Sequence, residues 1–481
     1  MNRRMVIYIT GCALMVVGLL MFLPIIVALI YHEGSATIIP LFESMFITVA
    51  CGAIMAARPP KKRNIYVREG LAITGLAWIV IVIFGSLPFL LTGAIPSIPD
   101  AIFETASGFT TTGSSILTDI ESLPHSILFW RSFSIFIGGM GILVFAVAVM
   151  PRSNSEDIHL LKSEMPGPSF DKVLARIRTV ARVFYLIYAT LTLILIIVLV
   201  IAGLSPFDAM VHAFAAAGTG GFSTYNTSIA AFDSVPVQLI LAFSILIFAV
   251  NFNLYFFALR GHWRDVLKSD ELHWFLGIVI AAIAAISINI MPRYDSIGIC
   301  VKDAFFNVAT IISTTGFGTV DYCQWPLFSQ LVLLMLMFTG GCAGSTAGGL
   351  KISRIVALVR MAGKKLRQAV NPKRVNVIVY ENKPLPERAQ NDIALYFILY
   401  VFCFIFLVVL LSFDNFDFAT TFSAAATTFN NVGPGLGEVG PTGNFSGFSD
   451  FSKFVFAFAM IAGRLEILPV VLLFAPSTWR A

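Results

Sequence analysis

Long apolar runs separated by short polar connections dominate the chain, and their lengths predict its elements. Residues 5–30 and 38–57 are two such runs, joined by a short turn around Gly34. About 20 consecutive apolar residues are enough for a helix to cross the hydrocarbon core of a bilayer. The first part of the chain is therefore expected to form a hairpin of two membrane-spanning helices.

From residue 71 onward a different unit appears, and it occurs four times in all. Each unit has a long apolar run, a short apolar run, a stretch rich in Gly, Thr and Ser, and a second long apolar run. The three runs are expected at 71–92, 99–109 and 126–149; at 183–203, 206–217 and 236–259; at 273–291, 302–312 and 326–359; and at 393–413, 417–429 and 451–475. Two crossings in the hairpin and two in each unit predict ten membrane crossings.

A fixed spacing supports the repeat. A residue able to cap a helix lies thirteen positions before each of Gly113, Gly221, Gly316 and Gly433. These capping residues are, in order, Asp100, Asp208, Asp303 and Thr420. Asp and Thr are favoured at helix N-caps, where the side chain accepts a hydrogen bond from a free backbone N–H. We therefore expect each of them to begin a short helix that ends just before its glycine.

The short runs predict a cation pathway. A helix of about ten residues cannot cross ~30 Å of hydrocarbon, so each short run is expected to enter the membrane and turn back. Non-helical backbone at membrane depth is tolerated only where it is buried in protein or lines a water-filled path. Helix C-termini, backbone carbonyls and threonine hydroxyls together favour a cation that has lost its hydration shell. Ordinary Gly/Ser turns are the simpler interpretation of one such stretch, and a secondary transporter with broken helices is the alternative for all four.

We therefore expect an all-α polytopic membrane protein with four helix–pore-helix–helix repeats around one central pore, plus an N-terminal two-helix hairpin. The hairpin with a basic loop is expected at 1–68, and the repeats at 69–182, 183–271, 272–391 and 392–481. Internal repeats in membrane proteins usually place the transport site where the repeats meet.

The composition agrees with this assignment and sets an orientation. Of 481 residues, 57% are hydrophobic and 12% are charged, with a mean hydropathy of +0.86, whereas soluble domains are about 25% charged. Basic residues gather in loops such as 58–63 and 360–374, which the positive-inside rule places in the cytoplasm together with the N-terminus. The net charge of +5 does not indicate nucleic-acid binding, because the basic residues form no patch with interleaved aromatics. The six cysteines include no CxxC pair, so neither a zinc site nor a disulfide framework is indicated.

The four glycine segments are similar to the filters of potassium channels. They read Thr111-Thr112-Gly113, Thr219-Gly220-Gly221, Thr314-Thr315-Gly316 and Asn431-Val432-Gly433. Four such segments in one chain, together with Trp130-Arg131 and Gly138-Gly139-Met140-Gly141 in the first unit, resemble the superfamily of potassium transport proteins that includes TrkH, KtrB and the plant HKT proteins. The extra N-terminal hairpin resembles the TrkH branch.

This resemblance implies a function, a location and partners. It implies that the twelve residues of the four segments bind potassium, the transported ion, with no organic cofactor on this chain. It implies potassium uptake across a bacterial inner membrane by a homodimer in the lipid bilayer, with a cytosolic, nucleotide-binding TrkA-like ring controlling opening. Proton- or sodium-coupled potassium symport is the alternative.

A glycine-rich stretch interrupts the second long run of the third unit. It contains Gly340, Gly341, Gly344, Ser345, Thr346, Gly348 and Gly349. Each interior glycine destabilises a helix by roughly 1 kcal/mol relative to alanine, so a straight helix is not expected here. Close packing of small residues against another helix is one interpretation. The family resemblance favours the other, a flexible loop that gates the path.

Two arginines lie in apolar surroundings. A charge inside a membrane helix destabilises insertion by about 2.5–3.5 kcal/mol and usually faces water or a partner. For Arg464 the interpretations are a salt bridge, for example with Glu466, or a positive barrier in the cavity below the filter, which the resemblance favours. Arg131 lies near the outer end of its helix and is expected to brace the filter.

Two other classes of protein are disfavoured. A voltage-gated channel would carry arginine at every third position of a helix, and no helix here does. A membrane-embedded hydrolase would need a nucleophile–base pair or a metal motif such as HExxH, and neither occurs in the sequence. We therefore expect no enzymatic activity.

Overall fold

The computed structural model describes residues 2–60, 67–141, 177–371, 377–381 and 383–476. These residues form helices almost throughout, with a single two-stranded hairpin among them. The expected all-α membrane fold is therefore confirmed.

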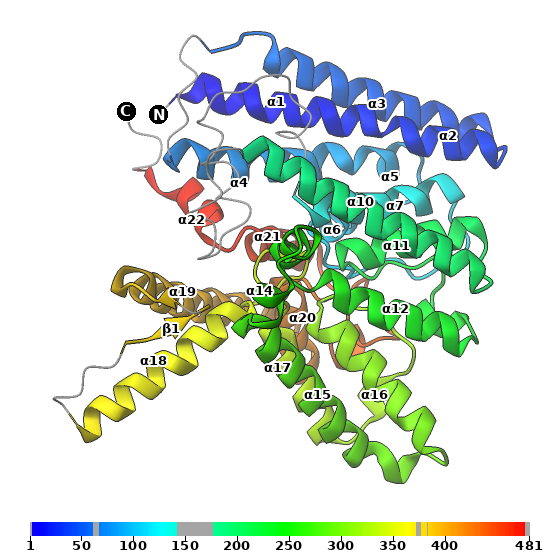
Figure 1. The fold of residues 1–481 in the computed structure, drawn as a ribbon. Coiled ribbons are helices and arrows are strands. Elements are labelled where there is room, and N and C mark those ends of the chain that lie inside the picture. The colour runs from blue at the N-terminus through cyan, green and yellow to red at the C-terminus, as the bar shows by residue number, and fades with distance from the viewer. Residues whose placement is uncertain (1, 61–66, 142–176, 372–376, 382, 477–481) are drawn as a thin grey trace.

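The N-terminal hairpin lies along one edge of the molecule (Figure 1). Helix α1 (Arg3–Leu20) continues as α2 (Phe22–Ile30), and α3 (Ser35–Ala56) runs back beside α1. Glycines at the contact allow the two backbones to approach closely, as is common between membrane helices.

The four repeats follow in chain order. The first contains α4 (Val67–Gly85), α5 (Leu87–Leu91), α6 (Ile98–Phe109) and α7 (His125–Gly139). The second contains α10 (Ile177–Ile201), α11 (Pro206–Gly218), η4 (Ser228–Ala231), α12 (Val235–Phe248), α13 (Phe252–Leu259) and α14 (Trp263–Leu267). The third contains α15 (Asp270–Ile290), η5 (Met291–Arg293), α16 (Ile297–Ile312), η6 (Tyr322–Gln324), α17 (Leu327–Thr339), α18 (Ile352–Val370), β1 (Val379–Tyr380) and β2 (Lys383–Pro384). The fourth contains α19 (Glu387–Leu411), η7 (Ser412–Asp414), α20 (Phe418–Asn430), η8 (Gly437–Val439), α21 (Asp450–Arg464) and α22 (Leu468–Phe474).

The repeats close into a ring. The second helix of each repeat packs against the short helix of the next: α7 on α11, α12 on α16, α17 on α20, and α21 back on α6. Figure 1 shows this order, from the cyan helices through green and yellow to the red helices that return beside the first repeat. The short helices α6, α11, α16 and α20 are consequently held by neighbours on both sides.

The second helices of the second, third and fourth repeats are broken, although the sequence predicted an interruption only in the third, so the continuous runs expected at 236–259 and 451–475 are corrected. Among the described residues, six helical stretches are long and apolar enough to cross a membrane. By contrast, α12 and α13 meet at a bend of 89°. Helix α17 ends at Thr339, and three residues separate the end of α21 from the start of α22. The helix expected at 126–149 is described only as far as Gly141. The break before α13 lies inside an apolar run, so hydropathy alone could not reveal it, whereas glycines mark the break after α17.

The short helices also begin earlier than expected. Their N-caps are Ser97, Ser205, Ser296 and Asp417. Asp100, Asp208 and Thr420 instead occupy the third position of their helices, and Asp303 lies in the middle of α16. In α6 and α11 a proline occupies the first turn, where its missing N–H is tolerated, so the cap lies upstream of it.

Candidate ion pathway

The four glycine segments (111–113, 219–221, 314–316 and 431–433) share one backbone conformation. Each short helix is followed by a residue in the left-handed region: φ is 58° at Thr111, 56° at Thr219, 54° at Thr314 and 56° at Asn431. The next N–H then donates to the carbonyl five residues earlier: Thr112 to Ser107, Gly220 to Ala215, Thr315 to Thr310 and Val432 to Thr427, at 2.8–2.9 Å. This is a Schellman-type helix end, which most often uses glycine.

Threonine at these ends is strained. A β-branched residue at positive φ is a true outlier, and such a conformation costs about 1–3 kcal/mol. Three of the four segments nevertheless use threonine there. The hydroxyl of Thr314 accepts a hydrogen bond from Gly348 N at 2.7 Å, so at this position the side chain makes a contact that glycine could not make.

The four segments close into a ring of carbonyl oxygens beside glycines. A β-carbon added to Gly113 would lie 2.0 Å from Gly220 O, and one on Gly221 would lie 2.1 Å from Thr315 O. A β-carbon on Gly316 would lie 2.3 Å from Val432 O, and one on Gly433 would lie 3.0 Å from Thr112 O. Each glycine thus faces the segment of the next repeat, and the fourth faces the first.

Side chains tie the fourth segment to the first, where the ring closes. Asn431 Nδ2 donates to Thr112 Oγ1 and to Met460 O, both at 2.9 Å. Ser114 Oγ donates to Gly433 O at 2.9 Å. The asparagine that replaces threonine in the fourth segment therefore has a structural role at the last junction.

A cavity of about 120 Å³ lies beside the ring. All four central glycines line it, together with hydroxyl and amide side chains that include Ser114, Ser115, Asn226, Thr442 and Asn444. Carbonyl and hydroxyl oxygens are the groups that replace the water around a potassium ion. The four segments are therefore brought together, with their central glycines at the end of a polar cavity.

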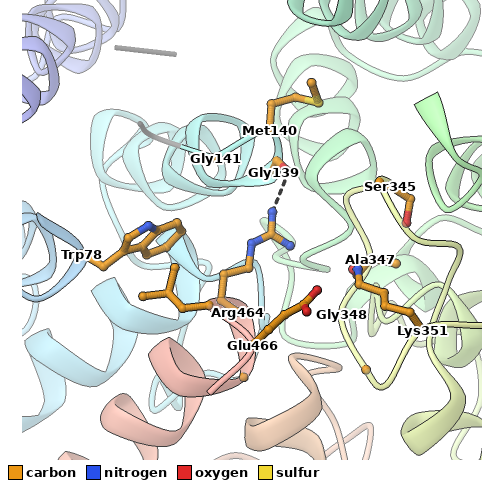
Figure 2. A pocket seen from close by; sticks show the side chains of 14 residues that line it. Trp78, Gly139, Met140, Gly141, Ser345, Ala347, Gly348, Lys351, Arg464 and Glu466 are labelled. Atoms are coloured by element: carbon orange, nitrogen blue, oxygen red, sulfur yellow. Dashed lines mark hydrogen bonds between the residues drawn. The ribbon is translucent and has the colours of Figure 1, made fainter. Parts of the chain in front are cut away.

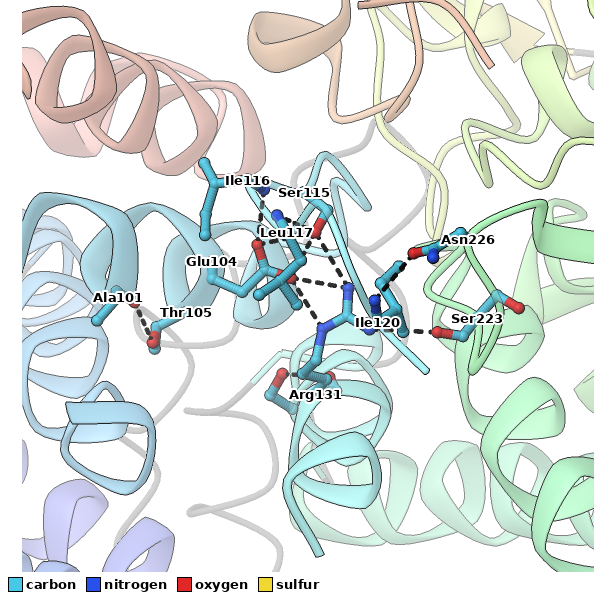
Figure 3. Close-up of polar contacts among 11 residues, drawn as sticks. Ala101, Glu104, Thr105, Ser115, Ile116, Leu117, Ile120, Arg131, Ser223 and Asn226 are labelled. Carbon is cyan, nitrogen blue, oxygen red and sulfur yellow. Dashed lines mark hydrogen bonds and ion pairs between the residues drawn. The ribbon is translucent and has the colours of Figure 1, made fainter. Parts of the chain in front are cut away.

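Arg131 contacts residues that follow the first two segments in the chain (Figure 3). Its Nε donates to Glu104 Oε1 at 2.8 Å, its Nη1 to Ser223 O at 3.2 Å and its Nη2 to Ser115 Oγ at 3.3 Å. Its guanidinium also lies 4.1 Å from the ring centre of Phe222. Arg131 and Glu104 are both buried, and the contacts support the expected bracing role.

Removing one partner of this pair is expected to destabilise the protein strongly. Loss of one member of a buried ion pair costs about 3–5 kcal/mol, because it leaves the other charge buried without its partner. Arg131→Ala should therefore unfold at a clearly lower temperature than the wild type in detergent. Arg264→Ala, at an exposed position, serves as the control. An unchanged unfolding temperature for Arg131→Ala would show that Arg131 is not a brace.

The residues between α17 and α18 form a loop on the other side of the ring. Gly340 ends α17 with φ 69° and ψ −169°, a conformation open to glycine. A β-carbon on Gly348 would lie 2.2 Å from Asn430 O. Cys342 N donates to Ala249 O at 3.0 Å, which anchors the loop to the bend between α12 and α13. No helix occurs between Gly340 and Lys351, all of which are described, so the interpretation as helix packing is wrong.

Arg464, the last residue of α21, joins this loop to the first repeat (Figure 2). Its guanidinium donates to Thr346 O at 2.5 Å, and to Gly138 O and Gly139 O at 2.8 and 2.5 Å. Glu466 forms an ion pair with Arg354 of α18. The surrounding cavity, lined in part by Arg464, Ser345 and Gly348, measures only about 50 Å³, room for a few water molecules.

One contact of the loop was not expected from the sequence. The carboxylate of Glu271, at the start of α15, accepts a hydrogen bond from Ala343 N at 2.7 Å. The stretch Ser269-Asp270-Glu271 has the ordinary pattern of a helix N-terminus, with a cap followed by acidic residues. Nothing in that pattern distinguishes a carboxylate that faces solvent from one that contacts a distant loop.

Comparisons with known proteins agree over the whole chain. The profile of the TrkH family, described as a cation transport protein, matches residues 39–268 and 272–480. The chain is 36% identical over the full length of both proteins to the Trk system potassium uptake protein TrkH of Escherichia coli strain K12. It is 32% identical to the TrkG protein of the same strain, with 99% of each chain covered. The crystal structure of the potassium transporter TrkH from Vibrio parahaemolyticus superimposes with a TM-score of 0.90 at 34% identity, covering 100% of both chains.

Proposed function

This chain belongs to the TrkH family of cation transport proteins, and from that premise we propose that it is a potassium-selective pore that mediates potassium uptake. The four glycine segments are the proposed selectivity filter, in which carbonyl oxygens and threonine hydroxyls replace the water around the ion. Transport, and not a chemical reaction, is the proposed activity.

The ring of segments is the observation that carries this proposal. Four copies of one strained helix end, each beside a glycine that faces the next repeat, place oxygen atoms around one axis. Such a ring offers neutral oxygens and no carboxylate. Neutral carbonyl ligands suit a weakly hydrated monovalent cation better than a divalent one.

The loop between α17 and α18 and Arg464 are the proposed gate. Gly348 donates to Thr314 of the third segment, and a β-carbon on it would lie 3.1 Å from Asn431 Cβ of the fourth, so the loop lies against both segments. Arg464 adds a positive charge beside it. A fixed positive charge in a narrow passage raises the barrier for a cation.

The setting of the pore is proposed from the family and from the charge pattern. We propose a multi-pass protein of the bacterial inner membrane whose N-terminus and basic loops face the cytoplasm. Two copies are proposed to form a homodimer, with one pore in each. A cytosolic, nucleotide-binding TrkA-like ring is the proposed regulator.

Ion flux into liposomes tests the proposed function. The full chain, reconstituted into liposomes, is expected to take up potassium at least about ten-fold faster than sodium, corresponding to ~1.4 kcal/mol of discrimination. Uptake should proceed at equal pH and equal sodium on both sides. Uptake that requires a proton or sodium gradient would favour coupled symport, and equal rates for potassium and sodium would exclude a potassium filter.

A further inference from the structure

The first turn of α15 joins the proposed gate to the cytoplasmic hairpin formed by β1 and β2. We propose that Glu271 is a positioning residue that holds the α17–α18 loop in its closed position, and that Glu381 of the hairpin holds Glu271. This inference rests on the proposed function, since it concerns how the gate of that pore is held.

The contact between Glu271 and the α17–α18 loop is buried and specific. Glu271 is 3% exposed, and its Oε1 accepts from Ala343 N at 2.7 Å. Its other oxygen accepts from Asn251 Nδ2 at 3.4 Å. Asn251 in turn lies against the loop, because a β-carbon on Gly344 would be 3.2 Å from its Oδ1. The carboxylate therefore fixes both the loop and the residue that caps α13.

The contact between α15 and the hairpin depends on Glu381, the residue that follows β1. Its Oε1 accepts from Ser269 Oγ at 2.9 Å and from Glu271 N at 3.1 Å. Its own N–H donates to Asp270 Oδ2 at 3.2 Å, and Arg360 of α18 donates to the same oxygen at 2.9 Å. One hairpin residue thus contacts three consecutive residues at the N-terminus of α15.

The chemistry explains why the contact favours one loop position. A hydrogen bond from a backbone N–H to a carboxylate is charge-assisted and short, and it is stronger than a bond between neutral groups. Moving the loop away would leave the buried carboxylate without this donor. A displacement of the hairpin would move the first turn of α15, and the acceptor of Ala343 would move with it.

Potassium flux through the full chain in liposomes tests the inference. Removing a charge-assisted bond from the closed state is expected to shift the gate roughly ten-fold toward opening, so Glu271→Ala should raise flux by up to about ten-fold. Glu271→Gln should raise flux less than Glu271→Ala, because its amide oxygen can still accept from Ala343 N but carries no charge. Glu381→Ala should raise flux to a smaller extent. Glu387→Ala, an exposed acidic residue at the start of α19, is the matched control and should change nothing.

Several outcomes separate this inference from the function on which it rests. The potassium-to-sodium ratio should stay at the wild-type value in every variant, because none touches the filter. Wild-type flux in a folded Glu271→Ala protein, alongside raised flux in a variant with a shortened loop, would overturn the inference and leave the proposed function intact. If Glu271→Ala does not fold, Glu381→Ala decides, and unchanged flux in that variant would overturn the inference. A wild-type protein that does not select potassium would instead overturn the function.

Discussion

Gly316→Ser is expected to lower the preference for potassium over sodium by roughly ten-fold or more, or to stop transport, since one added group of this size can cost 1–3 kcal/mol. A β-carbon at this position would lie 2.3 Å from Val432 O and 2.7 Å from Pro434 Cδ. Gly316 also has φ of 85°, a region that L side chains rarely adopt. The substitution must therefore push the third and fourth segments apart and enlarge the ring.

Gly318 provides the matched control for this substitution. It lies two residues further along the same stretch, and a β-carbon there would be 3.5 Å from its nearest neighbour, Pro441, an ordinary contact distance. Gly318→Ser should therefore keep the wild-type selectivity in the same liposome assay. If Gly316→Ser also kept wild-type selectivity, the assignment of the third segment to the filter would be wrong.

Shortening the loop between α17 and α18 is expected to produce the second large effect. Deletion of residues 343–346 removes Thr346, which accepts from Arg464, and Ala343, which donates to Glu271. The two ends of the loop lie together, since a β-carbon on Gly340 would be 2.9 Å from Gly349 Cα, so the shortened loop can still connect α17 and α18. Potassium flux into liposomes should rise by about ten-fold or more, because two charge-assisted contacts that hold the loop in its observed position are lost together.

Ser345→Ala is the control for the deletion. The hydroxyl of Ser345 donates only locally, to Cys342 O at 2.6 Å, so its loss keeps the length of the loop and its contacts with Arg464 and Glu271. Flux in this variant should equal that of the wild type. Reduced or unchanged flux in a folded deletion variant would show that the loop supports the fold and does not close the path.

The features of the proposed pore that depend on local sequence could be predicted. The central glycines were recognisable because each lies at the same distance from a polar residue near the start of a short apolar run. In three repeats that residue is the third of its helix, so the spacing follows the helix length, whereas α16 begins four residues further upstream of Asp303. The glycine-rich stretch in the third repeat was recognisable for a similar reason, because so many glycines cannot remain in one helix.

The features that depend on distant contacts could not be predicted. Asn431 appeared only as a departure from the threonine of the other segments, whereas in the structure it joins the fourth segment to Thr112. The break before α13 lies within the apolar run expected at 236–259, although in the structure Asn251 caps α13. The partner of Arg131 is Glu104, which lies 27 residues earlier in another helix.

The N-caps of the short helices could not be predicted either, although they depend on nearby residues. Asp100 and Asp208 were expected to be N-caps, but serines three residues earlier have that role. Carboxylates in the first turn of a helix are also favourable, since they interact with the positive end of its dipole. Residue type alone therefore could not separate the cap from the third position of the helix.

The current reversal potential of the wild-type protein in a planar bilayer tests the central claim most directly. Potassium would be set at unequal concentrations on the two sides, with sodium making up the ionic strength and with equal pH. The account predicts that the current reverses at the Nernst potential of potassium and follows it when the potassium gradient is changed. A reversal potential near zero, or one that follows an imposed proton or sodium gradient at fixed potassium, would contradict a potassium-selective pore.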